Sequence, residues 1–248
     1  MQLDGAPSIP RTAATVLVLR DDPFEVLMLR RHARATFPSM LVFPGGVVDP
    51  GDSEPTWDDL VSGDAGLTAE QRAIRIAGVR ETWEESGLLI AHHGGKHPGS
   101  DASTPFPAVA RGAGNGRIAV DELQHFAHWV TPEVEPKRFD TRFYLARAPE
   151  GQIAQADGGE TLAHRWVNPR EMLERAGSDE PPLMFPTRLN LLRLAESENS
   201  EQAFAAARQR PRFTVRPTVE RVTDGIVVSI PAEAGYSVTE QFAPMRQP

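Results

Sequence analysis

The pattern of apolar and polar positions predicts alternating strands and helices along most of the chain. Residues 13–19 are apolar and rich in β-branched side chains, which is typical of a buried strand, and residues 25–30 predict a second strand. Asp21-Asp22-Pro23 between them is a turn signal, so we expect a hairpin. A short strand at residues 41–43 is expected to stop at Pro44-Gly45-Gly46. Further strand-like stretches are residues 126–131, 142–147, 165–167, 213–215 and 226–230.

Three helices are indicated by their starting signals. Thr68-Ala69-Glu70-Gln71 has the spacing of a capping box, which predicts a helix from Thr68 to about Glu85 with Gly87 as its stop. Asn168-Pro169 predicts a cap and first residue for a helix over 169–174. Phe185-Pro186-Thr187 introduces another helix that reaches about Leu194.

The segments between these elements contain many Gly, Pro and polar residues. We interpret residues 49–66 as an inserted loop, residues 94–117 as a surface loop and residues 155–160 as a polar loop. No linker strong enough to separate domains is visible. We therefore expect one α/β domain, divided as a core at about 13–175, an insertion at 53–67, the surface loop at 94–117 and a C-terminal extension at 176–248.

The helix over 68–85 combines apolar faces with acidic residues at its end. At 100° per residue, Glu81, Glu84 and Glu85 fall within about 100° of each other. Ile74, Ala77 and Gly78 share that face, whereas Ile76, Val79 and Trp83 lie opposite. Apolar residues on two sides predict a helix packed between two layers. Carboxylates at a helix C-terminus repel each other and the negative end of the macrodipole, and a hard dication would offset both effects.

Composition and charge limit the classes of function. About 40% of the 248 residues are hydrophobic, 24% are charged, and the formal net charge is −8. An acidic chain is a poor partner for nucleic acid phosphates. The chain contains no cysteine, which excludes disulfides and thiolate sites and is compatible with a reducing compartment. Neither a signal peptide nor an apolar run long enough for a membrane is visible, so we expect a cytoplasmic protein.

Two segments together resemble the Nudix box. In the family form, a glycine is followed by five residues, Glu, seven residues, Arg-Glu, an aliphatic residue, any residue, Glu-Glu, any residue and Gly. Gly46 matches the first glycine, and Arg80, Glu81, Glu84, Glu85 and Gly87 match the second half. The resemblance implies an α/β/α sandwich with a mixed central sheet and a C-terminal helical and strand extension.

The match departs from the family form at three places. Asp52 stands where the family has Glu, and Thr82 replaces the usual aliphatic residue. Between Asp52 and Arg80 lie 27 residues rather than seven, an insertion of 20. An insertion here resembles the acyl-coenzyme A diphosphatase branch of the family, as do Trp129-Val130-Thr131-Pro132, residues 138–144, and Ile230-Pro231 with Tyr236. The branch is found in peroxisomes, but the chain lacks the C-terminal tripeptide of that branch, and its localisation is not carried over.

The resemblance implies a hydrolase that cleaves a nucleoside diphosphate linked to another moiety. It implies Mg²⁺ or Mn²⁺ held by Glu81, Glu84, Glu85 and the Gly46 carbonyl, with Arg80 positioning the glutamates. The general base lies on the helix or on a distal loop, where Glu160 is our candidate, with Asp121 and Glu122 as weaker alternatives. Attack of water on a diphosphate needs charge neutralisation and an activated nucleophile, which carboxylate-bound cations supply.

Other polar residues are open to two interpretations. Arg30, Arg31 and Arg34 are either substrate-phosphate ligands or a solvated basic strand end. We interpret His92, His93 and His97 as a solvated loop rather than a metal site. We expect Trp129 and Phe143 to be core residues rather than base-stacking platforms.

Two rival functions remain open at this level. One is a catalytically silent nucleotide-binding module, against which the intact Arg80 and glutamates argue. The other is a hydrolase of nucleotide sugars or dinucleotides instead of coenzyme A or its acyl derivatives, because one scaffold hosts many substrates. We expect a small-molecule nucleotide diphosphate as substrate, no nucleic acid or membrane partner, and the sequence leaves a homodimer open.

Overall fold

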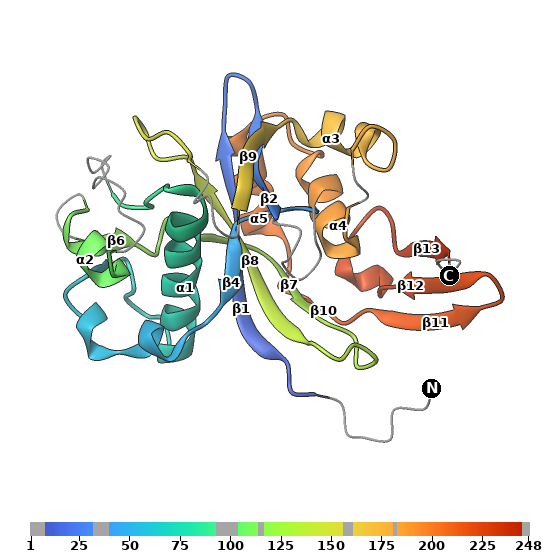
Figure 1. Ribbon diagram of the computed structural model, residues 1–248, viewed down its shortest axis with the longest axis horizontal. Helices are drawn as coiled ribbons and strands as arrows, with labels where there is room; N and C mark the ends of the chain where they lie inside the picture. The colour runs from blue at the N-terminus through green and yellow to red at the C-terminus, as the bar shows by residue number, and fades with distance from the viewer. Residues whose placement is uncertain are drawn as a thin grey trace.

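The computed structural model describes residues 8–31, 40–92, 104–113, 117–155, 161–180 and 183–244 (Figure 1). Its centre is an eight-stranded sheet with the path β10-β7-β8-β1-β2-β3, in which β4 also pairs with β1 and β9 with β2. The strands are β1 (Arg11–Arg20), β2 (Glu25–Arg31), β3 (Leu41–Val42), β4 (Gly45–Val47), β7 (Gln124–Val130), β8 (Phe139–Arg147), β9 (Thr161–Val167) and β10 (Thr214–Val215).

The sheet is mixed, as expected. β1 runs parallel to β8 and antiparallel to β2, and the β1–β2 hairpin confirms the predicted turn at residues 21–23. The predicted strand at residues 41–43 ends before Pro44, as β3, but the glycines that follow were not expected to form a strand. Gly45–Val47 is β4 and pairs antiparallel with β1, with Gly46 opposite Ala14. A glycine pair weakens a strand on its own, so the pairing with β1 and the packing above it decide the conformation.

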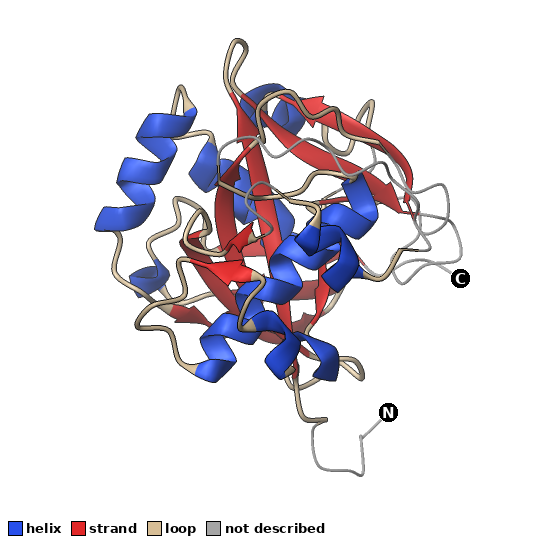
Figure 2. Cartoon of the chain, turned by 90° about the vertical axis from the view of Figure 1, so that its left-hand side faces the viewer, coloured by secondary structure: helices blue, strands red, loops and turns tan. Residues whose placement is uncertain are grey.

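Helices cover both faces of this sheet, which makes three layers (Figures 1 and 2). α1 (Ala69–Ser86) and α2 (Phe106–Arg111) lie on one side. α3 (Pro169–Arg175), α4 (Phe185–Leu194) and α5 (Ser200–Gln209) lie on the other. The α/β/α arrangement of the sequence analysis is therefore confirmed.

The predicted ends of α1 are confirmed by its caps. The Thr68 side chain accepts a hydrogen bond from the Gln71 N–H, and the Gln71 side-chain oxygen accepts one from the Thr68 N–H. Gly87 has φ 69°, the left-handed conformation that glycine adopts without a Cβ clash. The Asn168 side-chain oxygen caps α3 by accepting hydrogen bonds from the N–H groups of Arg170 and Glu171.

The inserted segment and the segment after α1 pack together over the outer side of α1. They contain η1 (Pro50–Ser53), η2 (Pro55–Trp57), β5 (Val61–Ser62), α2 and β6 (Ile118–Ala119). β5 pairs in parallel with β6, and the rings of Trp57 and Phe106 lie 5.6 Å apart. The predictions of plain loops at 49–66 and 94–117 are therefore wrong where residues are described, since Trp57 and Phe106 are buried core residues and Phe106 begins α2.

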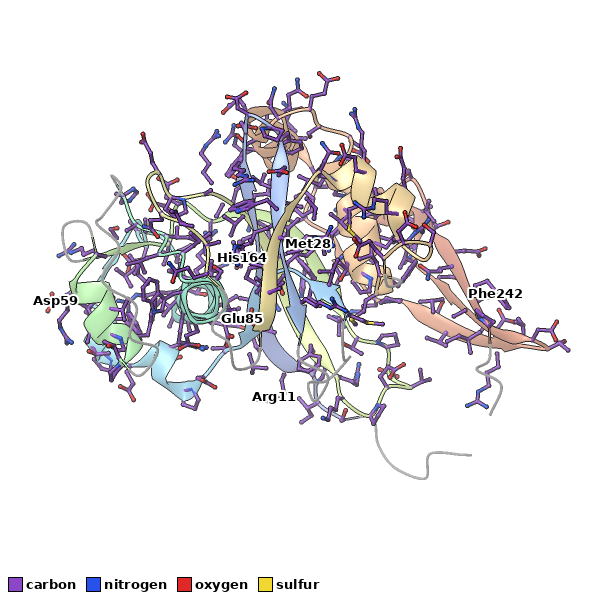
Figure 3. All side chains as sticks on the ribbon, turned by 45° about the horizontal axis from the view of Figure 1, so that its top comes forward. Arg11, Met28, Asp59, Glu85, His164 and Phe242 are labelled. Atoms are coloured by element: carbon purple, nitrogen blue, oxygen red, sulfur yellow. The ribbon has the colours of Figure 1, made fainter. Side chains whose placement is uncertain are left out.

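The C-terminal part of the chain covers the opposite face of the sheet. Apolar residues of α4 and α5, such as Leu191 and Phe204, share one core with Leu17, Met28 and other sheet residues. Beyond them, β11 (Thr218–Val222), β12 (Gly225–Ser229) and β13 (Glu240–Pro244) form a separate three-stranded sheet, with Phe242 at its outer part (Figure 3). The division of the chain into core, insertion and extension stays a prediction. Among the described residues, no helix has the length and apolar character to cross a membrane.

Candidate functional site

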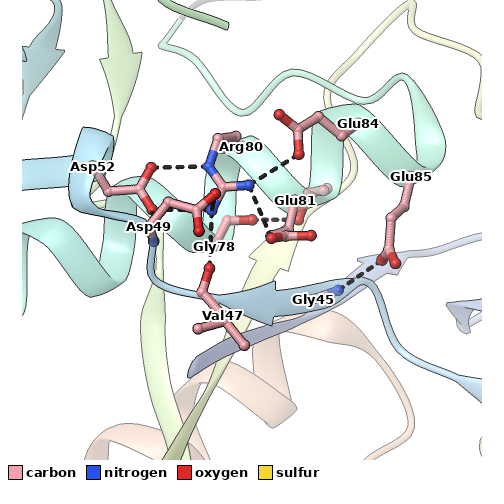
Figure 4. Close-up of polar contacts among 10 residues, drawn as sticks. Gly45, Val47, Asp49, Asp52, Gly78, Arg80, Glu81, Glu84 and Glu85 are labelled. Atoms are coloured by element: carbon pink, nitrogen blue, oxygen red, sulfur yellow. Dashed lines mark hydrogen bonds and ion pairs between the residues drawn. The ribbon is translucent and has the colours of Figure 1, made fainter. Parts of the chain in front are cut away.

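Two glutamates of α1 lie directly on the glycines of β4. The Glu85 carboxylate accepts a hydrogen bond of 2.8 Å from the Gly45 N–H (Figure 4). A Cβ placed on Gly46 would lie 2.4 Å from the Glu81 carboxylate, closer than real atoms approach. The missing side chain of Gly46 leaves the space that the carboxylate occupies, so any larger residue there would displace Glu81 from its present position.

α1 can come this close because its inner face is small. A Cβ on Gly78 would lie 3.4 Å from the Ala14 Cβ and 3.3 Å from a Val16 methyl group, so glycine allows close packing on β1. Ile76 and Val79 are fully buried, and Trp83 is 6% exposed. The expectation of a helix packed between two layers is confirmed. Figure 3 shows Glu85 between α1 and the central strands.

Arg80 connects the acidic residues of the site. Its guanidinium donates two hydrogen bonds to buried Asp52, at 2.9 and 3.0 Å. It also donates to Glu81 and Glu84, both at 2.9 Å, and to the Val47 carbonyl at 3.0 Å (Figure 4). Asp52 thus meets Arg80 in spite of the residues inserted between them, and the shorter acid in place of glutamate does not break the contact.

The surroundings of Asp52 explain how the insertion is tolerated. Asp49 and Asp52 close a capping box at η1, in which the Asp52 side chain accepts from the Asp49 N–H at 2.8 Å. Trp57 donates from its indole N–H to the Gly51 carbonyl at 2.8 Å. The segment that follows β4 is therefore fixed locally, and the additional residues lie over the outer side of α1 instead of displacing Asp52.

Burial and charge oppose each other in the site. Desolvation raises the pKa of Glu81 and of Glu84, while Arg80 acts in the opposite direction on both. Burial by itself lowers the pKa of Arg80, but hydrogen bonding to Asp52 and the negative charges of Glu81, Asp52 and Glu84 raise it well above its usual value. The exposed fraction of the side chain is 17% for Glu81 and 47% for Glu84. One arginine therefore compensates only part of the negative charge of this edge.

The donor chemistry of the site fits a hard dication, but the donors are not gathered as we expected. Carboxylate and carbonyl oxygens are the ligands that Mg²⁺ and Mn²⁺ prefer. Within the described ranges, no three acidic or histidine side chains are placed to hold an ion as they stand. The reason is visible in their partners: Glu81 and Glu84 turn to Arg80, and Glu85 turns to Gly45. Cation binding at this edge therefore requires the carboxylates to converge from the positions they hold here.

The remaining predicted residues lie outside this cluster or outside the described residues. Arg30 is exposed at the end of β2, and of Arg31 only the backbone, in the same strand, is described. Arg34, Glu160, His93 and His97 lie outside the described residues. Trp129 and Phe143 are buried, which confirms them as core residues.

Asp121 and Glu122 are engaged elsewhere. His92 places its Nε2 3.0 Å from Asp121 and its Nδ1 3.2 Å from Glu122. A Cβ on Gly63 would overlap the Asp121 side chain, so this group belongs to the layer made by the inserted segment. The weaker candidates for the general base are thus bound to His92, and the interpretation of His92 as a merely solvated loop residue is wrong.

The sequence analysis missed the roles of two backbone groups. The Gly45 N–H and the Val47 carbonyl hold Glu85 and Arg80, respectively. The signal available was the glycine pair, but the sequence analysis treated these residues as the end of a strand and did not predict β4, which orients both groups.

Comparisons with known proteins match this geometry. A family model described as NUDIX domain matches residues 9–186. A Caenorhabditis elegans protein named as nudix hydrolase 7 is 30% identical over 194 residues, which cover 75% of this chain and 61% of that protein, so the chain spans less than two thirds of this relative. The Gallus gallus protein named acyl-coenzyme A diphosphatase NUDT19 is 27% identical over 300 aligned positions, covering 91% of this chain and 77% of the relative.

The solved structures agree with the sequence relatives. The crystal structure of a NUDIX hydrolase from Alicyclobacillus acidocaldarius is similar with a TM-score of 0.65 and 32% identity, covering 80% of this chain and 96% of that one. The likeness in fold therefore extends over most of this chain.

Proposed function

This chain belongs to the Nudix hydrolase family, and on that premise we propose that it cleaves the diphosphate linkage of a nucleotide derivative with the help of Mg²⁺ or Mn²⁺. The observation that carries the proposal is the contact of Glu81 and Glu85 with the Gly45-Gly46 backbone, with Arg80 and Glu84 beside them. Glu81, Glu84, Glu85 and the Gly46 carbonyl would hold the cation. When bound, a dication neutralises phosphoryl oxygens and lowers the pKa of a water ligand.

Arg80 is a positioning residue in this proposal. Its two bonds to Asp52 fix the guanidinium, so its remaining N–H groups hold Glu81 and Glu84 at the edge of α1. Glu85 is the least exposed of the three glutamates, at 7% exposure, and the Gly45 N–H fixes its orientation. These contacts keep three carboxylates at one edge of the sheet, where a diphosphate would need neutralisation.

The general base stays a prediction with two alternatives. Glu84 has the most exposed side chain of the three helix glutamates, so its carboxylate is accessible to a water molecule in its present position. Glu160, the distal candidate, lies outside the described residues. A pH profile of kcat/KM for Glu84→Gln and Glu160→Gln separates them, because loss of the base removes the acidic limb of the profile.

For the substrate, we propose coenzyme A or an acyl derivative of it. The support is the named activity of the NUDT19 relatives, with 27% identity in the chicken protein and 24% in the human protein. Cleavage of the diphosphate would yield adenosine 3′,5′-bisphosphate and 4′-phosphopantetheine or its acyl ester. Nucleotide sugars and dinucleotides are the competing substrates, since one scaffold serves many of them.

The experiment is a substrate panel with Mg²⁺ or Mn²⁺, with the products identified by mass spectrometry. We expect hydrolysis that disappears with a chelator and falls at least about 100-fold in Glu85→Gln, because loss of a ligand exceeds the 10–100-fold effect of an outer partner. Glu70→Gln, an exposed change in the first turn of α1, is the matched control and should retain activity. No hydrolysis of any substrate would favour the silent binding module, and full activity of Glu85→Gln would remove that residue from the site.

A further inference from the structure

A small cavity lies where β7 meets the C-terminal part of the chain. Its volume is about 150 Å³, and its wall includes Phe126 and Phe213 as aromatic residues. The titratable residues that line it are His125, Arg193, Arg210 and Glu233. Two of the four, Arg193 and Arg210, are cationic at pH 7 and one is a carboxylate, in a chain whose net charge is −8. The local charge at this cavity therefore departs from the charge of the whole chain.

Arg193 is the unusual member of this wall. It is only 6% exposed, and within the described part of the chain it forms no ion pair with a carboxylate. One Nη donates to the Ala234 carbonyl at 2.6 Å and to the Gly235 carbonyl at 3.3 Å, and the guanidinium lies 3.4 Å from the centre of the Tyr236 ring. Its Nε is buried and, among the described residues, has no hydrogen-bond partner. A buried charged group without a carboxylate partner is costly, so an anion beside the guanidinium would be stabilising.

The backbone beside Arg193 is also irregular. β7 pairs regularly with β8 up to His125, but the register shifts between His125 and Ala127, which leaves Phe126 as the extra residue of a bulge. Bulges re-aim side chains and are frequent beside binding sites. Here the bulge brings His125 and Phe126 to the same cavity.

Among the residues that line the cavity, the two arginines outnumber the one carboxylate. Burial, followed by the nearby charge of Arg212, lowers the pKa of His125 to about 4, so this histidine is neutral at pH 7. Arg210 pairs with Glu196, which leaves Glu233 as the acidic residue among those lining the cavity. Glu233 is exposed to solvent, whereas Arg193 is buried. An anion inside the cavity would therefore lie close to a poorly solvated arginine, and the acidic residue of the wall would be the better solvated one.

We propose that this cavity binds the phosphate group of a small phosphorylated molecule, with the guanidinium groups of the buried Arg193 and the more exposed Arg210 as donors. A volume of about 150 Å³ corresponds to about five water molecules at about 30 Å³ each, which is room for an inorganic phosphate and not for a nucleotide. The planar guanidinium groups suit tetrahedral oxyanions, to which arginine donates two parallel bonds. The rest of a larger phosphomonoester would extend from the cavity into solvent.

This site is distinct from the glutamates of α1. The register places Gly45 opposite Thr15, Thr15 beside Phe143, and Phe143 opposite Ala127, which is three strand spacings or about 14 Å across the sheet. Phe126 and Ala127 belong to the core on the side of α4, and α1 lies on the other side. The proposal does not depend on hydrolysis, because binding can be measured without a divalent cation.

The test is a calorimetric titration of the full chain with inorganic phosphate in the presence of a chelator. A parallel titration with acetate shows whether a carboxylate binds as well as a phosphate. We expect saturable binding of phosphate at one site, weaker binding of acetate, and at least tenfold weaker phosphate binding in Arg193→Met and in Arg210→Gln. Arg208→Gln is the matched control, because Arg208 is 52% exposed in the same segment and does not line the cavity.

Histidine NMR of the same samples locates the anion. Bound phosphate should raise the pKa of His125, because a negative charge favours the imidazolium. Absence of saturable binding, equal weakening in Arg208→Gln and Arg210→Gln, or an unchanged His125 on saturation would each overturn the proposal. If Arg193→Met fails to fold, the comparison of Arg210→Gln with Arg208→Gln still decides the outcome.

Discussion

Arg80 and Arg193 are both buried, at 9% and 6% exposure, but their surroundings have opposite effects. Arg80 meets the carboxylates of Asp52, Glu81 and Glu84, and these charges outweigh burial and raise its pKa. Arg193 meets two backbone carbonyls and the ring of Tyr236, and burial lowers its pKa. Burial of an arginine therefore has no single meaning. The partners of a buried arginine decide whether its charge holds neighbouring carboxylates in place or stays available to attract an anion.

The largest expected effect is that of Arg80→Met, which breaks the first half of the comparison. The change leaves Asp52, 2% exposed, as a buried carboxylate without its partner. Removing one member of a buried pair costs about 3–5 kcal/mol of unfolding free energy. Denaturant unfolding measures this loss, and hydrolysis should fall about 10–100-fold as well, since outer partners of a metal site have effects of this size. A stability within about 1 kcal/mol of wild type would contradict the account.

The double variant Asp52→Leu/Arg80→Met sharpens the same point. A buried ion pair replaced by apolar residues is often neutral in stability, so the double variant should recover most of the free energy lost in Arg80→Met. Activity should stay low, because Glu81 and Glu84 still lack the guanidinium that holds them. Recovery of both quantities together would mean that Arg80 serves the fold alone.

Arg193→Met tests the second half and should lower stability by less. It removes a charged hydrogen bond to Ala234, worth about 1.5–3 kcal/mol, and a cation–π contact with Tyr236, worth about 2 kcal/mol when desolvated. The buried Nε no longer needs a partner, which reduces the net loss to about 2–4 kcal/mol. Thermal unfolding and the hydrolysis assay are measured together, and kcat/KM of the folded fraction should not change. A parallel loss of activity would connect this region to the glutamates.

Gly46→Ala tests the close approach of the Glu81 side chain to the backbone of β4. The added methyl would lie 2.4 Å from the Glu81 carboxylate and must displace it, which we expect to lower kcat/KM about tenfold, or about 1.4 kcal/mol. Gly51→Ala is the matched control, because a Cβ there meets nothing within 4 Å. Steady-state kinetics of the two variants give the answer, and equal activities would show that the position of Glu81 over Gly46 does not matter.

The smallest effect concerns the pH dependence of stability near the anion cavity. His125 has a folded pKa of about 4, below its ordinary value of about 6.5, so the unfolded chain binds its proton first as the pH falls. The contribution of neutral His125 to the free energy of unfolding is fully present above about pH 6.5 and is lost as the pH falls towards 4. The difference in unfolding free energy between wild type and His125→Gln should therefore become smaller as the pH is lowered from about 6.5 to about 4. A constant difference across it would contradict the assignment of a buried neutral histidine.

The local signals in the sequence predicted much of the fold and of the acidic site. The capping box at Thr68 and the stop at Gly87 gave both ends of α1, since capping depends on neighbouring residues only. The spacing of Arg80, Glu81, Glu84 and Glu85 predicted the acidic end of that helix, because helical geometry places residues three and four apart on the same face. The proposed roles of Arg30 and Glu160 stay predictions.

The features that sequence analysis missed depend on contacts between distant residues. β4 contains two glycines, which indicate a turn locally, and it is a strand because Ala13, Ala14 and Thr15 pair with it. α2 lies in a segment with a loop-like composition and is buried by the inserted segment, through Trp57 and Phe106. The partners of Arg193 are separated from it by about 40 residues, and no spacing rule predicts that contact.

The most direct test of the central claim is the binding of Mn²⁺ to the metal-free chain and to Glu85→Gln, followed by calorimetry. The account predicts saturable binding in wild type and at least tenfold weaker binding in the variant, with Glu70→Gln equal to wild type. Equal Mn²⁺ affinity in wild type and Glu85→Gln, or no saturable binding in either, would contradict the assignment of the glycine-backed glutamates as a cation site.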